Sequence, residues 1–364
     1  MTWYANSKAR SWKCDAPSAA VAQFHQSLNN YEFTPLIELP SIAAELGVSR
    51  VFVKDESARL NLAAFKVLGA SWAVAQALTN GAEPTSLAQV ASAIDRANPP
   101  ILVAATDGNH GRAVAHMARQ LGLECFIVIP RGVSELAINN VRGEGAHVTV
   151  LDASYDEAVA AAKIRAAEVI NGLHIQDMSW DGYVDIPNWI IEGYTTLCTE
   201  VDEQLREVDA YPADLVAVPV GVGAFLHSVV AYYRSRSDAS PSILSVEPEV
   251  ADCVLQSLRN GALTSVDTGV TIMSGMNCGT PSSDSWPLHQ AGVDAAVALS
   301  DDQTRAALTT LHRLNLDAGP CGAATLAGVR EALSTLERRT ELGITPDSVI
   351  VLISTEGRAA NPQV

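Results

Sequence analysis

The sequence has few positive charges and no long apolar segment. Its 364 residues include 24 lysines and arginines against 41 aspartates and glutamates, which gives a formal net charge of −17. Such a chain repels nucleic acid and anionic lipid, and no stretch of about twenty residues is uninterruptedly apolar, so we expect no nucleic-acid or membrane partner. The first ten residues also lack the apolar core of a secretory signal, and we expect a cytoplasmic protein.

Cysteine is scarce, and the spacing of the cysteines does not match a zinc site. None forms a C-x-x-C pair or a Cys/His cluster; the six are Cys14, Cys125, Cys198, Cys253, Cys278 and Cys321. We therefore expect free thiols in a reducing compartment and no metal site. The sequence also has no low-complexity segment and no short tandem repeat.

Short apolar strands alternate with helical segments along most of the chain. With 48% hydrophobic residues, a chain of this length can form one large α/β domain or two domains. The predicted strands are residues 50–54, 101–105, 125–129, 147–151, 174–175, 215–219, 242–246 and 348–354. The predicted helices are 40–46, a helix from Phe65 onward, a short helix within 82–100, 112–121, 133–142, 155–171, 186–208, 225–234 and 319–336. Buried strands joined by short connections predict an α/β fold with doubly wound, mostly parallel sheets.

Four loops that follow predicted strands are rich in glycine or polar residues. They span residues 106–111, 176–183, 220–225 and 354–357. Open parallel sheets bind ligands outside the carboxyl ends of their strands, so these loops together predict a ligand site.

Two of these loops have a composition that suits particular ligand groups. The turn Val220-Gly-Val-Gly-Ala-Phe225 could present backbone N–H groups to a phosphate, although a tight turn without a ligand is an equal alternative. The loop Thr106-Asp-Gly-Asn-His-Gly111 precedes a helix and suits a carboxylate; an Asp or Asn capping turn is the alternative.

Lys66 follows a largely apolar run, residues 60–65, and precedes another, residues 67–77. Its side chain either lies along the surface or holds its amine in a pocket of low dielectric constant. In such a pocket the amine loses its proton more easily and becomes a nucleophile for carbonyl groups.

Several of these stretches resemble one enzyme family, the fold type II pyridoxal-phosphate enzymes, over nearly the whole chain. The matching segments are Lys54-Asp-Glu-Ser57, Ala64-Phe-Lys-Val-Leu-Gly69, the loop 106–111, the glycine turn 221–224 and Ser354. Within the family, Asp107, the segment 176–183 and the segment 272–279 resemble the diaminopropionate ammonia-lyases. The resemblance implies pyridoxal 5′-phosphate as the cofactor and a small amino acid as the substrate.

The resemblance also implies residue roles. For the cofactor it implies Lys66 as the Schiff-base lysine, Asn109 at the ring oxygen, Gly221, Val222, Gly223 and Ala224 at the phosphate, and Ser354 or Thr355 at the ring nitrogen. For the substrate carboxylate it implies Thr106, Asp107, Gly108 and His110. Lys66 would remove the α-proton of the L-isomer and Asp107 that of the D-isomer, with Asp177 as a third catalytic group.

The implied reaction is α,β-elimination of 2,3-diaminopropionate to pyruvate and ammonia. Elimination or replacement on another β-substituted amino acid, as in dehydratases and cysteine synthase, is the alternative. A non-catalytic homologue is a third possibility, against which the intact Lys66 argues. Ala63 stands where the family usually has asparagine, and Gly319-Pro320 replaces part of a usual Glu-Ser-Gly-Ala turn. Both departures lie near the expected substrate pocket.

The same resemblance predicts a domain division and an oligomeric state. Residues 71–180 would form a small domain inserted in a large cofactor-binding domain of residues 1–70 and 181–364. Analogy at the level of the fold predicts a homodimer.

Overall fold

The computed structural model describes residues 2–106, 108–238 and 240–360. Its contacts divide the chain into two units: unit 1 contains residues 1–17, 33–58 and 197–364, and unit 2 contains residues 18–32 and 59–196. These boundaries differ from the predicted ones, since residues 18–32, 59–70 and 181–196 belong to unit 2. The reason is that α3 (Lys66–Leu78) packs against both α5 (Asn109–Leu121) and α8 (Asp185–Gly193).

Unit 1 is built on a seven-stranded sheet in the order β1-β10-β9-β8-β11-β3-β2. The strands are β1 (Trp3–Ala5), β2 (Leu36–Glu38), β3 (Arg50–Asp55), β8 (Leu215–Pro219), β9 (Ser242–Pro248), β10 (Ala295–Leu299) and β11 (Val349–Ser354). All neighbours are parallel except β1 with β10 and β2 with β3, at the two edges. The carboxyl ends of β8 and β11 therefore lie at one end of the sheet, where the turn at 220 and Ser354 follow.

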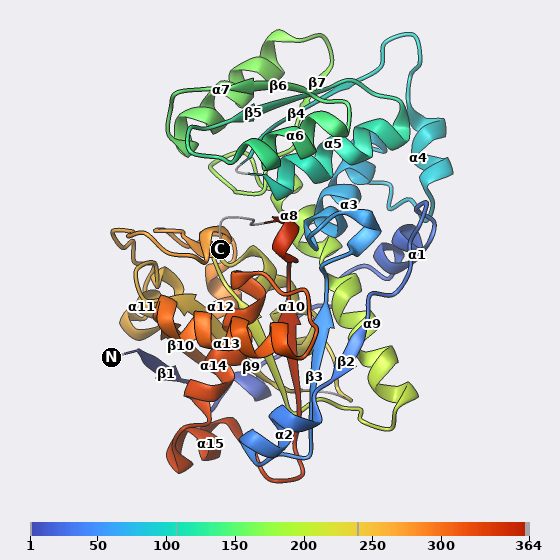
Figure 1. Ribbon diagram of the computed structural model, residues 1–364. Helices are drawn as coiled ribbons and strands as arrows, with labels where there is room; N and C mark the ends of the chain where they lie inside the picture. Colours follow the sequence, from blue (N-terminus) through green and yellow to red (C-terminus); the bar gives the residue numbers. More distant parts are fainter. Residues whose placement is uncertain (1, 107, 239, 361–364) are drawn as a thin grey trace. The chain divides into compact units, whose positions relative to one another are not determined.

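The helices of unit 1 lie around this sheet; α14, which Figure 1 shows along it, contacts β8, β9, β10 and β11. They are α2 (Pro40–Leu46), most of α9 (Thr195–Glu207), α10 (Ala224–Arg234), α11 (Cys253–Asn260), α12 (Trp286–Gly292), α13 (Asp301–Arg313), α14 (Pro320–Ala332) and α15 (Leu336–Leu342). Short 3₁₀ turns are η1 (Ala9–Ser11), η3 (Ser274–Met276) and η4 (Arg358–Ala360).

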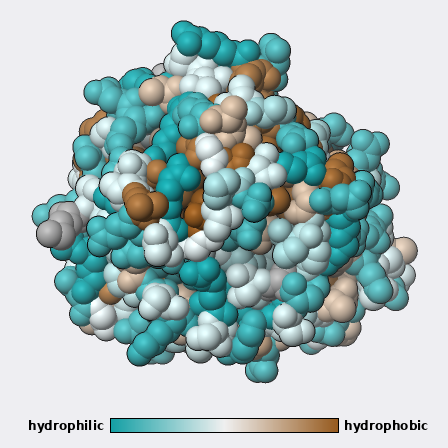
Figure 2. Space-filling model, turned by 90° about the horizontal axis from the view of Figure 1, so that it is seen from below, coloured by the Kyte–Doolittle hydropathy of each residue, from teal (hydrophilic) through white to brown (hydrophobic). Residues whose placement is uncertain are grey.

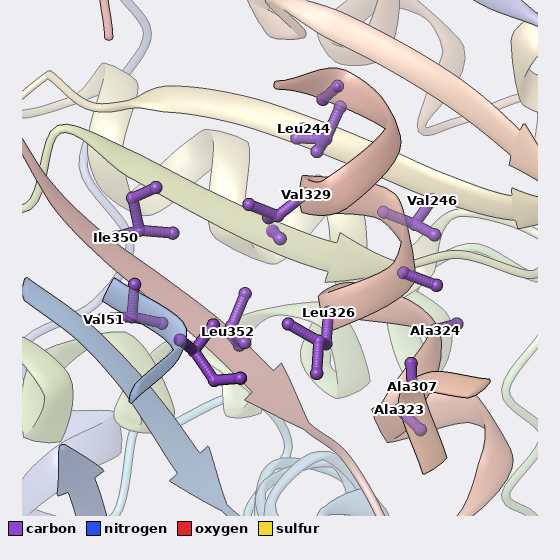
Figure 3. Packing of buried hydrophobic residues seen from close by; sticks show 14 of the residues in the cluster. Val51, Leu244, Val246, Ala307, Ala323, Ala324, Leu326, Val329, Ile350 and Leu352 are labelled. Atoms are coloured by element: carbon purple, nitrogen blue, oxygen red, sulfur yellow. The ribbon is translucent and has the colours of Figure 1, made fainter. Parts of the chain in front are cut away.

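The core of unit 1 lies between the sheet and α14. Val51, Ile350 and Leu352 project from β3 and β11 on one face of the sheet, because alternate strand residues point to the same side. Leu326 and Val329 of α14 cover them (Figure 3). Burial of these side chains fixes the strands, and with them the loops that follow β8 and β11.

Unit 2 contains a four-stranded parallel sheet in the order β6-β5-β4-β7. The strands are β4 (Ile101–Ala105), β5 (Cys125–Ile129), β6 (His147–Val150) and β7 (Gly172–His174). Besides α3, α5 and α8, its helices are α1 (Ala20–Gln26), α4 (Leu87–Ala93), α6 (Glu135–Gly143) and α7 (Tyr155–Glu168), with the turn η2 (Arg59–Asn61). The α/β fold with mostly parallel sheets is thus confirmed.

The long helix predicted at 186–208 is instead two helices, α8 and α9, with Tyr194 between them. Gly193 packs so closely on α3 that a Cβ there would lie 2.6 Å from the carbonyl oxygen of Leu68. The backbone tightens at this point, since the N–H of Tyr194 bonds to Ile191 three residues back.

The sequence did not predict β1, β2 or β10, nor the helices between 253 and 313. The strand β10 has the sequence Ala-Ala-Val-Ala-Leu, and alanine has little preference for strands. Its place in the sheet comes from pairing with β9 and β1, which are distant in sequence.

The face drawn in Figure 2 is mainly hydrophilic, with apolar residues in small groups, which agrees with the charge of the sequence. Among the described residues, no helix has both the length and the hydrophobicity needed to cross a bilayer.

Candidate active site

Lys66 is the first residue of α3 and lies in unit 2. The preceding turn contains Leu60 and Asn61 in left-handed backbone conformations, with φ values of 50° and 61°. The Lys66 side chain is 29% exposed, and its Nζ donates a hydrogen bond to Asp177 Oδ2 at 2.7 Å. The predicted lysine therefore lies beside one of the two predicted carboxylates, 111 residues away in sequence.

Asp177 lies in the loop that follows β7, and its side chain is 13% exposed. Burial disfavours the ionised carboxyl, but in the acidic range where this carboxyl titrates the positive charges of protonated His110 and of Lys66 outweigh this effect and hold the pKa of Asp177 well below its ordinary value. Asp177 is therefore ionised at neutral pH and can accept hydrogen bonds.

His110 completes this group from the first turn of α5. Its Nε2 lies 2.8 Å from the carbonyl oxygen of Ile175. Its Nδ1 lies 3.8 Å from Asp177 Oδ2 and has no hydrogen-bond partner among the described residues. The structure thus brings Lys66, Asp177 and His110 together.

A network of buried polar contacts holds the loop that carries Asp177. Gln176 accepts a hydrogen bond at Oε1 from the N–H of Ala105, at 3.0 Å. The hydroxyl of Tyr183 donates to the carbonyl oxygen of His174 at 2.6 Å and accepts from the N–H of Gln176 at 2.9 Å. The rings of Tyr183 and Trp180 stack with centroids 4.1 Å apart, which makes Trp180 a support of the loop.

The loop before α5 is held by Thr106. Its Oγ1 accepts hydrogen bonds from the N–H groups of Gly108 at 2.9 Å and Gly111 at 3.0 Å. Asn109 begins α5, directly after Gly108, so both lie at the positive end of the helix dipole. Asp107, the other predicted proton acceptor, lies outside the described residues.

Sequence reasoning missed Tyr194, which is buried close to Lys66. Its ring lies 4.7 Å from that of Phe65, between ring centroids. Burial is the main cause that raises the pKa of Tyr194, while the charge of Lys66 acts in the opposite direction. One feature of the sequence could have indicated a close neighbour: Gly69 lies within a predicted helix. In the structure a Cβ at Gly69 would lie 2.6 Å from the Tyr194 ring.

The glycine turn belongs to unit 1 and joins β8 to α10. Its carbonyl oxygens are bonded within the protein: Val222 accepts from the N–H of Ser282 at 2.9 Å, and Gly223 accepts from His289 Nε2 at 3.0 Å. In the ranges that the structure describes, no group accepts a hydrogen bond from the N–H groups of the turn, which are those of Gly221, Val222, Gly223 and Ala224. Four adjacent donors at a helix start are an arrangement that suits an anion.

Ser354 ends β11 in unit 1, with its side chain buried. Its Oγ has no hydrogen-bond partner among the described residues. Gly322 of α14 lies so close that a Cβ there would be 2.5 Å from that oxygen. Thr355 follows and is also buried. A buried hydroxyl without a partner is costly unless a ligand supplies one.

Comparison with known proteins identifies similar enzymes. The model of a family described as "pyridoxal-phosphate dependent enzyme" matches residues 28–356. The diaminopropionate ammonia-lyase of Salmonella typhimurium is 33% identical over 93% of this chain and 88% of its own length.

Two solved structures of the Escherichia coli diaminopropionate ammonia-lyase are also similar. The complex with D-serine has 30% identity and a TM-score of 0.85, covering 98% of this chain and 94% of that chain. A complex described as containing an aminoacrylate-PLP azomethine reaction intermediate has 29% identity and a TM-score of 0.83, covering 99% and 94%.

The residues of this chain fit pyridoxal phosphate. The four N–H donors of the glycine turn suit its phosphate, and the unpartnered Ser354 Oγ suits its ring nitrogen. The amine of Lys66, close to a carboxylate and only partly exposed, suits its aldehyde.

Proposed function

This chain belongs to the pyridoxal-phosphate dependent enzymes, and we propose that it is a lyase that converts 2,3-diaminopropionate to pyruvate and ammonia. The observation that carries this proposal is the 33% identity to a diaminopropionate ammonia-lyase over 93% of the chain. The contact between Lys66 and Asp177 supports it, because the reaction needs a base and a polar group for a second amine in one place.

Pyridoxal phosphate supplies an electron sink that stabilises negative charge at the α-carbon of a bound amino acid. We propose that Lys66 holds it covalently, that Asn109 bonds its ring oxygen, and that Ser354 or Thr355 bonds its ring nitrogen. The N–H groups of residues 221–224 would bind its phosphate.

The chain's own residues would then bind the substrate and move its protons. The N-terminus of α5 and the loop of Thr106, Asp107, Gly108 and His110 would receive the substrate carboxylate, to which His110 contributes its backbone N–H. Lys66 would take the α-proton of the L-isomer, and Asp107 that of the D-isomer. The electron pair of the C–H bond forms the new double bond, and the pair of the C–N bond leaves with the β-nitrogen. The released 2-aminoacrylate hydrolyses to pyruvate and a second ammonia.

The decisive experiment measures pyruvate and ammonia from a panel of β-substituted amino acids, including both isomers of diaminopropionate and of serine. We expect the highest kcat/KM with diaminopropionate. Reduction with borohydride should attach the cofactor to Lys66, and Lys66→Ala should lower elimination about 10²–10⁴-fold, whereas the exposed Lys8→Ala should not. Turnover of another amino acid with none of diaminopropionate would contradict the proposed substrate.

We also propose a homodimer in a reducing, cytoplasmic compartment. Two-fold dimers are the commonest soluble oligomers, and the six cysteines are free thiols in the structure. Light scattering after size-exclusion chromatography would test the dimer by its mass.

A further inference from the structure

The two ring nitrogens of His110 have different surroundings. A carbonyl oxygen can only accept a hydrogen bond, so the 2.8 Å contact with Ile175 requires the proton of His110 on Nε2. In the neutral ring, Nδ1 then carries a lone pair. This nitrogen is buried and has no hydrogen-bond partner among the described residues.

Asp177 Oδ2 faces this lone pair at 3.8 Å. An ionised carboxylate also only accepts hydrogen bonds, so two acceptors face each other at a distance too long for a bond between them. A donor nitrogen placed beside the pair can reach both atoms at the usual length of about 2.9 Å. The donor must carry at least two protons and is favoured by a positive charge, because the carboxylate is negative.

A primary ammonium already contacts this carboxylate in the structure. Lys66 Nζ donates to Asp177 Oδ2 at 2.7 Å. The same carboxylate oxygen is therefore accessible to amines from the side where Lys66 lies, and the substrate must reach that side for Lys66 to take its α-proton.

We infer that Asp177 and His110 bind the β-amino group of the substrate as an ammonium ion, and so select an amine as the leaving group. The inference rests on the proposed function and extends it to specificity. A β-ammonium has three protons, so it can donate to both Asp177 Oδ2 and His110 Nδ1. A β-hydroxyl has one proton and can donate to only one of them, which leaves a buried acceptor unpaired.

The same contacts prepare the nitrogen to leave. When the C–N bond breaks, its electron pair goes to the nitrogen, and an amine held as an ammonium departs as neutral ammonia. No further proton is needed, so Asp177 and His110 keep their protonation states. An amine held in its neutral form would leave as the far less stable amide anion.

The test compares two leaving groups in the holoenzyme. β-Chloroalanine loses chloride, which leaves without a proton and has no N–H groups to donate to Asp177 or His110. Diaminopropionate instead loses its β-nitrogen. The principal variant is His110→Gln, whose side-chain amide can still donate to Ile175 but offers no acceptor at the position of Nδ1. The matched control is His116→Gln on the same helix, because His116 instead contacts Glu144. The measurement is kcat/KM for pyruvate formation from each substrate.

We expect His110→Gln to lower kcat/KM for diaminopropionate about 10–100-fold, the effect of losing one hydrogen bond to a charged group. The same variant should change kcat/KM for β-chloroalanine little. His116→Gln should leave the ratio of the two values unchanged. Equal losses on both substrates, or no loss on either, would overturn the inference.

The variant His110→Asn gives a second measurement if His110→Gln is unstable. Its side-chain oxygen can lie near the position of Nδ1, so His110→Asn should keep more selectivity for diaminopropionate than His110→Ala. An asparagine variant no more selective than alanine would also overturn the inference. A wild-type enzyme that uses β-chloroalanine but not diaminopropionate would instead overturn the proposed function, and this inference with it.

Discussion

His289 donates a hydrogen bond from Nε2 to the carbonyl oxygen of Gly223 at 3.0 Å. Burial lowers the pKa of His289 to about 3, so the ring is neutral, and its single N–H is used in this bond. Gly223 has a φ of 98°, and a Cβ there would lie 2.2 Å from His289 Cε1. The ring and the glycine therefore hold the proposed phosphate turn in place together.

The first prediction concerns His289→Ala. Loss of the bond to Gly223 should let the turn relax and raise the dissociation constant of pyridoxal phosphate about tenfold or more. Titration of the apo protein followed by visible absorbance measures this constant. His147→Ala, at an exposed position in unit 2, is the control and should bind the cofactor as the wild type does. Unchanged affinity in His289→Ala would show that the turn does not depend on the ring.

Gly322→Ala should weaken cofactor binding through Ser354. The added methyl would lie 2.5 Å from Ser354 Oγ and must displace either Ser354 or α14. Overpacking of this kind costs about 1–3 kcal/mol, which thermal unfolding of the apo protein measures. Gly143→Ala is the control, since a Cβ there meets nothing within 4 Å. A Gly322→Ala protein as stable as this control, with unchanged absorbance of the bound cofactor, would contradict the proposed contact of Ser354.

Asp107→Asn tests the two proton acceptors separately. If Asp107 takes the α-proton of the D-isomer, the variant should lose activity on D-diaminopropionate about 10²–10⁴-fold and retain much of its activity on the L-isomer. Both rates are obtained from pyruvate formation with pure isomers. Similar losses on the two isomers would mean that Asp107 serves the structure of the loop instead.

Glu247 should make stability depend on pH. Burial raises the pKa of this carboxyl from 4.5 to about 8, although the N–H groups of Val254 and Leu255 donate to it at 2.8 and 2.7 Å. Between pH 4.5 and about 8, Glu247 is therefore protonated in the folded state but ionised in the unfolded state. The contribution of Glu247 to the free energy of unfolding should therefore be largest below about pH 4.5. It should decrease as the pH rises to about 8.

The measurement is the free energy of unfolding in urea at several pH values, for the wild type and Glu247→Gln. The glutamine variant should show a shallower decline with pH, because its side chain does not titrate. Parallel curves would mean that Glu247 is ionised in the folded protein across this range.

Much of this fold could be predicted from local patterns. Apolar runs such as Ile101–Ala105 and Leu215–Pro219 are strands because their residues are buried on both faces of a parallel sheet. The loops after them were recognisable, because glycines and polar residues follow directly. The alanine-rich β10 and the edge strands β1 and β2 of unit 1 escaped prediction, since their pairing rather than their composition makes them strands.

The sequence by itself determined the parallel α/β fold and the chemical type of each candidate residue, because these depend on composition and order along the chain, and its resemblance to known enzymes indicated the cofactor. Only the tertiary structure decided which residues meet. It placed Asp177 on Lys66 across 111 residues, His110 Nδ1 3.8 Å from Asp177, and His289 at Gly223. Such contacts come from helix and strand packing between distant segments, and no local pattern contains them.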